Sequence, residues 1–206
     1  MKRGFTLVEM LVVVGIIAIL IGASISGYSA MAARAQKARA QETVSNVATA
    51  LAVILEQRGK WPKAIVDNVG KDDYRLNDKV AVALAAHKAL SLSYKQDEKT
   101  KAITMTGFDK YGVLDPWGIE VMRRNANAGR GTAVPSGGTI ADHIIRYSVD
   151  VDGRGFTEVS IGGSTFKVRA SAAAWCCGMD GKIESFSKAG RCDDVYSFGK
   201  NQRVNE

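Results

Sequence analysis

The stretch that decides the fold is GFTLVEMLVVVGIIAILIGASISGYSAMAA, residues 4–33. It contains 24 consecutive residues without a charge, from Met10 to Ala33. As an α-helix these residues extend about 36 Å, enough to cross a bilayer hydrocarbon core of about 30 Å. A removable secretory signal is the alternative, but its apolar region is shorter, roughly 7–15 residues, and ends in an A-x-A-like cleavage site. The sequence therefore favours a retained membrane helix over about residues 8–31.

One acidic residue, Glu9, directly precedes this uncharged run and lies one turn inside the apolar helix that the sequence predicts from residue 5. A carboxylate at the centre of a bilayer costs about 2.5–3.5 kcal/mol on insertion scales, so such an acid indicates a functional role with a partner. Two interpretations are open. Either Glu9 lies near the interface and reaches water, or it neutralises a positive group when subunits pack together, because pairing offsets the desolvation of both charges.

Two basic residues precede the run Gly4-Phe5-Thr6-Leu7-Val8-Glu9, and the apolar segment follows it. This order resembles the class III signal of type IV pilins and of type II secretion pseudopilins. The resemblance implies that residues 1–4 are a leader, that a prepilin peptidase cleaves after Gly4, and that it methylates the new amino group of Phe5. It also implies that Glu9 pairs with the Phe5 amine of a neighbouring subunit, and that the C-terminal domain lies outside the cytoplasm.

Beyond Met31 the helical pattern becomes amphipathic and continues to Arg58. Apolar residues recur there at steps of three and four, with polar residues between them. They are Val44, Val47, Leu51, Ile54 and Leu55. No proline interrupts residues 5–58, and Gly59 followed by Pro62 is typical of a helix end. The pattern predicts one helix over residues 5–58 whose second half packs by one face on a globular domain.

Residues 59–206 are numerous enough to form a core of their own. The pattern predicts a helix over 77–90, capped by Asn77, strands over 102–106, 144–151 and 166–175, and a mobile loop over 129–138. A long helix followed by a short helix and strands indicates an α+β fold. By resemblance the fold is type IV pilin-like, with the N-terminal helix packed on a small antiparallel sheet domain.

The sequence Asp115-Pro116-Trp117-Gly118 predicts a packed turn, because proline and glycine favour turns and aspartate bonds the turn backbone. This D-P-W-G step also resembles one found in the major pseudopilin of type II secretion. Ile119-Glu120 replaces the Asn-Pro that usually follows it.

A second acidic stretch near the C-terminus suggests a calcium site. Calcium binds six to eight oxygen ligands, and glycine helps a loop to curl around it. Asp180, Asp193 and Asp194 bracket such a loop, although Asp-Gly is also an ordinary turn. The order resembles the calcium-binding loop of major pseudopilins, which implies Asp180 and Asp193 as side-chain ligands with Asp194 adjacent. The loop is longer here, and a cysteine pair replaces the small residues that follow Trp175.

The three cysteines, Cys176, Cys177 and Cys192, are disulfide candidates if this domain lies in an oxidising compartment. A bridge from Cys192 to either of the others would close a loop of about 15 residues, worth about 3 kcal/mol in the entropic model. Free buried thiols are the alternative. A further acidic run, residues 150–155, is read as a hairpin turn and not as a second metal site, because it lacks the later glutamate of an EF-hand loop.

The composition and the motifs exclude several classes of protein. With 46% hydrophobic and 24% charged residues, the 206-residue chain is neither disordered nor collagen-like. The sequence contains no phosphate-binding loop, no nucleophile elbow and no zinc-protease motif, and His87 and His143 are interpreted as surface or core-edge residues. The net charge is +7, but the basic residues are scattered and not interleaved with aromatics, so no nucleic-acid partner is expected.

The resemblance to pseudopilins implies a non-enzymatic subunit of a type II secretion pseudopilus, held in the cytoplasmic (inner) membrane before assembly. The expected partners are the prepilin peptidase, other copies of the chain, minor pseudopilins, the secretion assembly platform and the membrane. The alternative is a type IV pilin for adhesion, motility or DNA uptake, in which the cysteines staple the C-terminal loop. A signal-anchored periplasmic enzyme is a third possibility, but it requires a clustered polar pocket that the sequence does not indicate.

Overall fold

The computed structural model describes residues 7–86, 94–96, 103–105, 112–125, 129–133, 137–183, 194–199 and 202–204. The side chains of residues 23–27, 29, 72, 94–96 and 103–105 lie outside this description. The chain divides into two compact units, Met1–Ala38 and Arg39–Glu206.

Helix α1 (Leu7–Arg58) is 52 residues long and continuous through the described residues. The absence of proline from this stretch allows an unbroken backbone hydrogen-bond ladder. The N–H of Gly59 donates to the carbonyl of Leu55 over 2.7 Å and closes the last turn. The predicted helix end at Arg58 is therefore confirmed.

Within the described residues, the second unit contains four further helical segments. They are α2 (Lys63–Val66), the 3-10 turn η1 (Asp72–Tyr74), α3 (Asp78–Ala86) and α4 (Pro116–Arg124). Asn77 caps α3 as predicted, because its side-chain Oδ1 accepts from the N–H of Val80 over 3.2 Å. The predicted extension of this helix over residues 87–90 lies outside the described residues.

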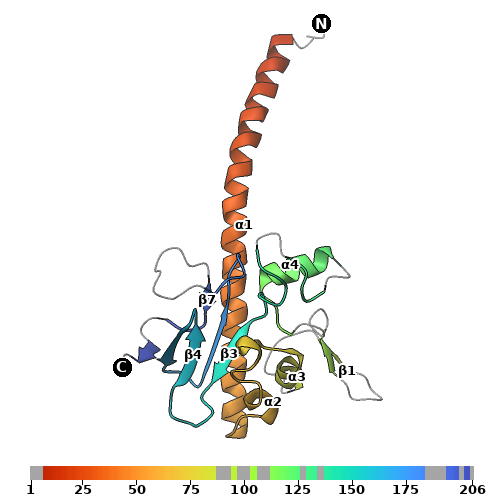
Figure 1. Ribbon diagram of the computed structural model, residues 1–206. Helices are drawn as coiled ribbons and strands as arrows, with labels where there is room; N and C mark the ends of the chain where they lie inside the picture. The colour runs from red at the N-terminus through yellow and green to blue at the C-terminus, as the bar shows by residue number, and fades with distance from the viewer. Residues whose placement is uncertain are drawn as a thin grey trace. The chain divides into compact units, whose positions relative to one another are not determined.

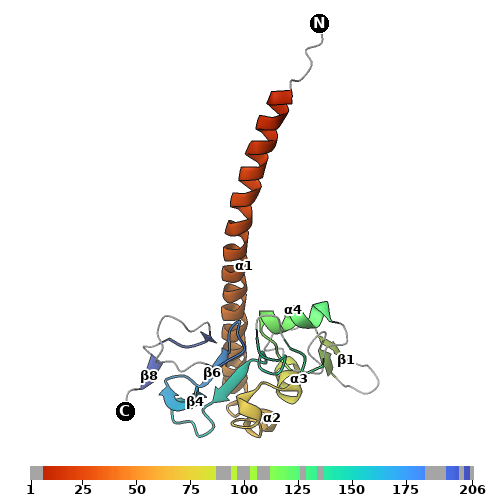
Figure 2. The ribbon, with the colours of Figure 1, turned by 45° about the horizontal axis from the view of Figure 1, so that its top comes forward.

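The strands that the structure describes form three small sheets, and every pairing in them is antiparallel. Their orders are β1-β2, β3-β6-β7 and β4-β5-β8. The strands are β1 (Tyr94–Gln96), β2 (Ile103–Met105), β3 (Arg146–Val149), β4 (Thr157–Ile161), β5 (Ser164–Val168), β6 (Ala172–Cys176), β7 (Val195–Tyr196) and β8 (Arg203–Val204). A long helix with small antiparallel sheets is the α+β, pilin-like architecture expected from the sequence. We call residues 39–58 of α1, which belong to the second unit, its second half. In Figures 1 and 2, α3 and α4 lie on one side of this second half, and β4 lies on the other.

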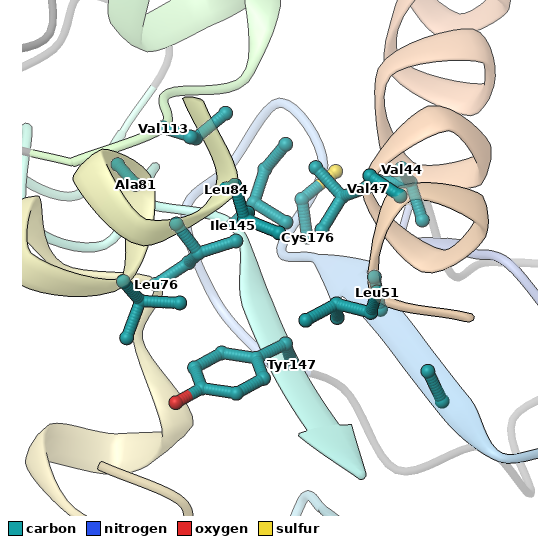
Figure 3. Packing of buried hydrophobic residues seen from close by; sticks show 14 of the residues in the cluster. Val44, Val47, Leu51, Leu76, Ala81, Leu84, Val113, Ile145, Tyr147 and Cys176 are labelled. Carbon is teal, nitrogen blue, oxygen red and sulfur yellow. The ribbon is translucent and has the colours of Figure 1, made fainter. Parts of the chain in front are cut away.

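The largest core forms where the second half of α1 packs on the sheet β3-β6-β7 and on α3. Val44, Val47 and Leu51 of α1 are fully buried and point toward Ile145, Tyr147 and Cys176 (Figure 3). The hydroxyl of Tyr147 donates to the carbonyl of Ile65 over 2.8 Å, so the polar end of this buried ring is satisfied. The predicted one-faced packing of the second half of the helix is thus observed.

Two expectations about turns are corrected by the structure. Asp115-Pro116-Trp117-Gly118 opens helix α4 and is not an isolated turn, because aspartate caps a helix start and proline fits its first position. Residues 150–155 do form a turn, but β3 and β4 on either side of it belong to different sheets, so it is not a hairpin. The Asp150 carboxylate accepts there from the N–H groups of Arg154 and Gly155, over 3.0 and 2.7 Å.

The predicted strand over 166–175 is in fact two strands. The chain leaves β5 at Val168 and enters β6 at Ala172. The intervening residues connect the sheet β4-β5-β8 to the sheet β3-β6-β7. No glycine or proline lies between Phe166 and Trp175, so the pattern could not locate the break.

Candidate functional site

Glu9 lies in the first turn of α1, and its side chain is exposed in the single chain. A carboxylate in this position interacts favourably with the positive end of the helix macrodipole. Gly4 and Phe5, the predicted processing residues, lie outside the described residues. Their cleavage, methylation and pairing with Glu9 remain predictions.

Large apolar side chains surround Glu9 and continue along α1, and they are exposed on every side of the helix. Relative exposures are 82% for Leu7, 68% for Leu11 and 73% for Ile19, and Val8, Met10, Val12, Val13, Val14, Ile16, Ile17, Leu20 and Ile21 are also exposed. We call these residues, from Leu7 to Ile21, the apolar surface of α1. An exposed apolar surface of this extent marks a site of contact with a partner or a lipid phase. Within the described part of the chain, no helix reaches the length and apolarity needed to cross a membrane.

The predicted calcium ligands are only partly described. Asp180 lies in a turn after β6, where its Oδ1 accepts from the N–H of Lys182 over 2.8 Å. Asp194 is buried, and its Oδ2 accepts from the hydroxyl of Tyr196 over 2.8 Å. Asp193 lies outside the described residues. Among the residues that are described, no three His, Cys, Asp or Glu side chains are grouped so as to hold a metal ion. These residues alone do not form the site, and calcium binding stays a proposal that depends on Asp193.

Cys176 and Cys177 are free thiols in the structure, and both are buried. Cys176 belongs to the main core. The Sγ of Cys177 accepts from Nη1 of Arg146 over 2.6 Å. Burial raises the pKa of Cys177 to about 12, although the positive charge of Arg146 acts in the opposite direction. Cys192 lies outside the described residues, so a bridge to it stays a prediction.

A buried pair of charged residues, Asp115 and His143, was not anticipated as a pair from the sequence. Both side chains are fully buried, and Nδ1 of His143 lies 2.9 Å from Oδ2 of Asp115. The other carboxylate oxygen, Oδ1, accepts from the N–H of Gly118 over 2.9 Å and so caps α4. The two residues are 28 positions apart. The available sequence signal was an aspartate in a helix-cap position, which indicates neither histidine nor burial.

Arg146, the first residue of β3, contacts η1, the carbonyl of Asp142 and Cys177, which follows β6. Its Nε and Nη2 donate to one oxygen of Asp73, over 3.1 and 2.7 Å, and Nη1 donates to the carbonyl of Asp142 over 3.1 Å. Asp73 and Tyr74 both have positive φ, 57° and 59°, which non-glycine residues adopt only when their surroundings hold them there. The contact between Asp73 and Arg146 is one such restraint.

Basic side chains lie against an aromatic ring near β4 and β5. Their scattered positions in the sequence did not predict this grouping. The guanidinium of Arg154 and the ammonium of Lys167 lie 4.9 and 5.4 Å from the ring centroid of Phe156. Arg154 also contacts the carboxylates of Asp152 and Glu158, at 3.1 and 3.7 Å. These acidic neighbours offset its positive charge, so the group does not form a basic stripe of the kind that tracks nucleic acid.

Comparison with known proteins identifies one part of the chain. No curated protein and no solved structure matches it. Residues 1–25 match the family model described as the prokaryotic N-terminal methylation motif. The matched stretch contains Gly4, Phe5 and Glu9. The chain therefore carries the prepilin cleavage and methylation signal of type IV pilin-like and pseudopilin-like proteins, and the match does not distinguish between these two subtypes.

Proposed function

We propose that this chain is a structural, non-enzymatic subunit of a type II secretion pseudopilus. A prepilin peptidase removes residues 1–4 and methylates Phe5. The processed subunit waits in the cytoplasmic membrane as a single-pass protein, with its N-terminus in the cytoplasm and its C-terminal domain outside. It then joins other copies and minor pseudopilins on the secretion assembly platform. The observation that carries this proposal is the methylation motif at residues 1–25, which leads into the apolar surface of α1.

The chemistry of assembly follows from the apolar surface and from Glu9. A helix that is apolar on all sides is stable where lipid or other apolar helices cover it. In such surroundings a carboxylate is costly, and a protonated amine from an adjacent copy offsets that cost. The methylated amine of Phe5 remains a cation, so it supplies the required charge. Assembly thereby becomes favourable only for processed subunits.

The preference for a pseudopilus over a type IV pilus rests on the C-terminal domain. The D-P-W-G step at 115–118 and the acidic residues Asp180, Asp193 and Asp194 resemble those of major pseudopilins. We further propose that these aspartates hold calcium. A pilin for adhesion, motility or DNA uptake is the alternative, and its characteristic disulfide staple would need Cys192 to bridge to Cys176 or Cys177. The burial of both thiols as free groups favours the first interpretation.

Processing is tested by replacing Gly4 with Leu in the full chain and comparing the N-terminal mass with that of the wild type. Cleavage after Gly4 requires a small residue there, so the variant keeps its leader. If both proteins have the same N-terminal mass, the cleavage proposal is wrong.

Charge pairing is tested with Glu9→Gln, which preserves shape and removes charge. Removing one member of a buried ion pair costs about 3–5 kcal/mol, so filament assembly falls by at least about 100-fold while cleavage and membrane insertion continue. Glu42→Gln is the matched control, because Glu42 is an exposed glutamate of the same helix in the second unit. Normal filaments from Glu9→Gln, or an equal defect in the control, would contradict the pairing.

The system is identified by deleting the gene in its host. Loss of exported proteins from the medium with normal surface pili supports the pseudopilus. Loss of pili, twitching or DNA uptake with normal protein export would instead identify the pilin alternative.

A further inference from the structure

His143 lies in the turn before β3, where its side chain is fully buried and both ring nitrogens face acceptors. Nδ1 lies 2.9 Å from the Oδ2 atom of Asp115, and Nε2 lies 3.2 Å from the carbonyl oxygen of Gly137. A neutral imidazole has a single N–H, so by itself it can donate to only one of these two groups. The geometry therefore requires a second proton at the site.

Two arrangements place that proton satisfactorily. In one, His143 is an imidazolium that donates to the Asp115 carboxylate and to the Gly137 carbonyl. In the other, Asp115 is protonated and donates to Nδ1, while Nε2–H donates to Gly137. Both arrangements contain the same number of protons and have no net charge. Losing the shared proton leaves a buried negative charge, and either the carboxylate or the carbonyl loses its donor.

The pair joins three segments that are distant in the sequence. Asp115 caps α4, and its N–H donates to the carbonyl of His143 over 2.9 Å. A Cβ atom at Gly118 would lie 2.8 Å from the Cβ of His143, so glycine is needed for α4 to approach this closely. A Cβ at Gly181 would lie 3.2 Å from Nε2 of His143 and 3.1 Å from the Cα of Gly138. The ring is thus enclosed by α4, by the turn at 137–138 and by the turn after β6.

The charged groups around the pair also favour retention of the proton. Burial lowers the pKa of His143, but the hydrogen bond and the charge of Asp115 more than offset this, so the pKa is raised above its usual value. The charge of Asp142 acts in the same direction. Burial also raises the pKa of Asp115, against the effect of its hydrogen bond with His143. The pKa values of both residues are raised, as expected if Asp115 and His143 share one proton and titrate together.

The other titratable groups near the pair do not reverse the rise in the pKa of His143. Asp142 faces Arg75, with 3.3 Å between Oδ1 and Nη2, and its pKa is lowered by contacts with Thr139 and by Arg75 and Arg146, although burial acts the other way. Cys176 is buried and electrostatically coupled to Asp115. Its thiol keeps its proton below pH 8, since burial raises its pKa.

We propose that Asp115 and His143 form a pH-sensitive clasp that holds the start of α4 and the two glycine turns on the domain, closed at mildly acidic and neutral pH and loosened under alkaline conditions. A histidine in an unfolded chain releases its proton around pH 6.5, whereas the clasp retains it to a higher pH. The equilibrium constant for opening therefore rises up to tenfold per pH unit above about 6.5, until the clasp itself loses its proton. Between about pH 4 and pH 6.5 both states hold one proton on the pair, so the contribution is fully present; below about pH 4 the open state also protonates Asp115 and the contribution falls.

The clasp is tested first without mutation, by NMR of the histidine rings in the full chain in detergent micelles. The sequence has two histidines, and His87→Gln assigns the signals. The ring signals of His143, whether they report an imidazolium or the Nε2–H tautomer beside a protonated Asp115, are expected to stay unchanged between about pH 6 and pH 7.5. A titration midpoint at or below about 6.5 would overturn the proposal.

Hydrogen exchange provides the second measurement, restricted to pH 6–8 so that unfolded-state cysteines do not contribute. After correction for intrinsic rates, the protection of residues 113–124 should fall up to tenfold per pH unit in the wild type and in His87→Gln. In Asp115→Asn, which keeps the cap acceptor, and in His143→Gln, this dependence should disappear. A pH dependence that persists in both clasp variants, or equal loss of protection over β4 and β5, would refute the clasp.

Discussion

Replacing Leu51 by Ala provides a direct test of how the second half of α1 is held. Leu51 is fully buried in the main core, where its side chain points toward Tyr147 (Figure 3). Truncating a buried leucine to alanine costs about 2.7–5.0 kcal/mol, because contacts are lost and a cavity remains. At about 2–4 °C per kcal/mol for a protein of this size, the melting temperature should fall by about 5–20 °C.

The control is the same substitution at Leu7, in the same helix. The side chain of Leu7 is 82% exposed, so its removal takes away little packing within the chain. Its effect on stability should stay within about 0.5 kcal/mol, or about 2 °C. If our proposal for the apolar surface is correct, Leu7→Ala weakens filament assembly instead.

Thermal unfolding of the full chain in detergent, followed by tryptophan fluorescence and circular dichroism, compares the two variants. Two outcomes would refute the reasoning. In the first, Leu51→Ala shifts the melting temperature by less than about 2 °C. In the second, Leu7→Ala shifts the melting temperature as much as Leu51→Ala does. That result would show that the Leu7 side chain contributes to stability as much as the Leu51 side chain does.

Two further predictions concern the C-terminal domain. Tyr147→Phe removes the donor to the Ile65 carbonyl and should cost about 1–3 kcal/mol, so an unfolding free energy unchanged within about 0.5 kcal/mol would show that the bond is not important. If the proposed calcium site exists, chelation should lower the melting temperature of the wild-type chain but leave that of Asp180→Ala unchanged. A wild-type chain that does not respond to chelation would leave ordinary packing as the support of that loop.

The parts of the fold that local sequence patterns determine could be predicted. Val44, Val47 and Leu51 recur at helical spacing, and that spacing alone places them on one face. Gly59 and Pro62 end the helix through their own backbone preferences. The cap of α3 was predictable for the same reason, since Asn77 bonds a group three residues away.

The parts that depend on distant residues could not be predicted. Asp-Pro at 115–116 has the same local chemistry at a turn and at a helix start, and only the packing of Trp117 and Val121 in the folded domain selects α4. The partner of Asp115 is His143, and no spacing rule connects an N-cap to a histidine in another segment. Likewise, residues 150–155 resemble a hairpin turn, but the assignment of β3 and β4 to different sheets is a tertiary outcome.

The two halves of α1 have different relations to their surroundings. Between Arg39 and Arg58 one apolar face is buried by the chain itself, and polar residues such as Glu42 and Glu56 are exposed, so this half is explained by its own domain. Between Leu7 and Ile21 the helix is apolar on every side, and its side chains are exposed. Such a helix has no polar face to present to water, so its sequence is explained only by contacts outside the chain. The methylation motif at residues 1–25 falls in this half. Under the proposed pairing, the acid at Glu9 has a physical reason, because among apolar partners a charge favours the neighbour that brings a cation.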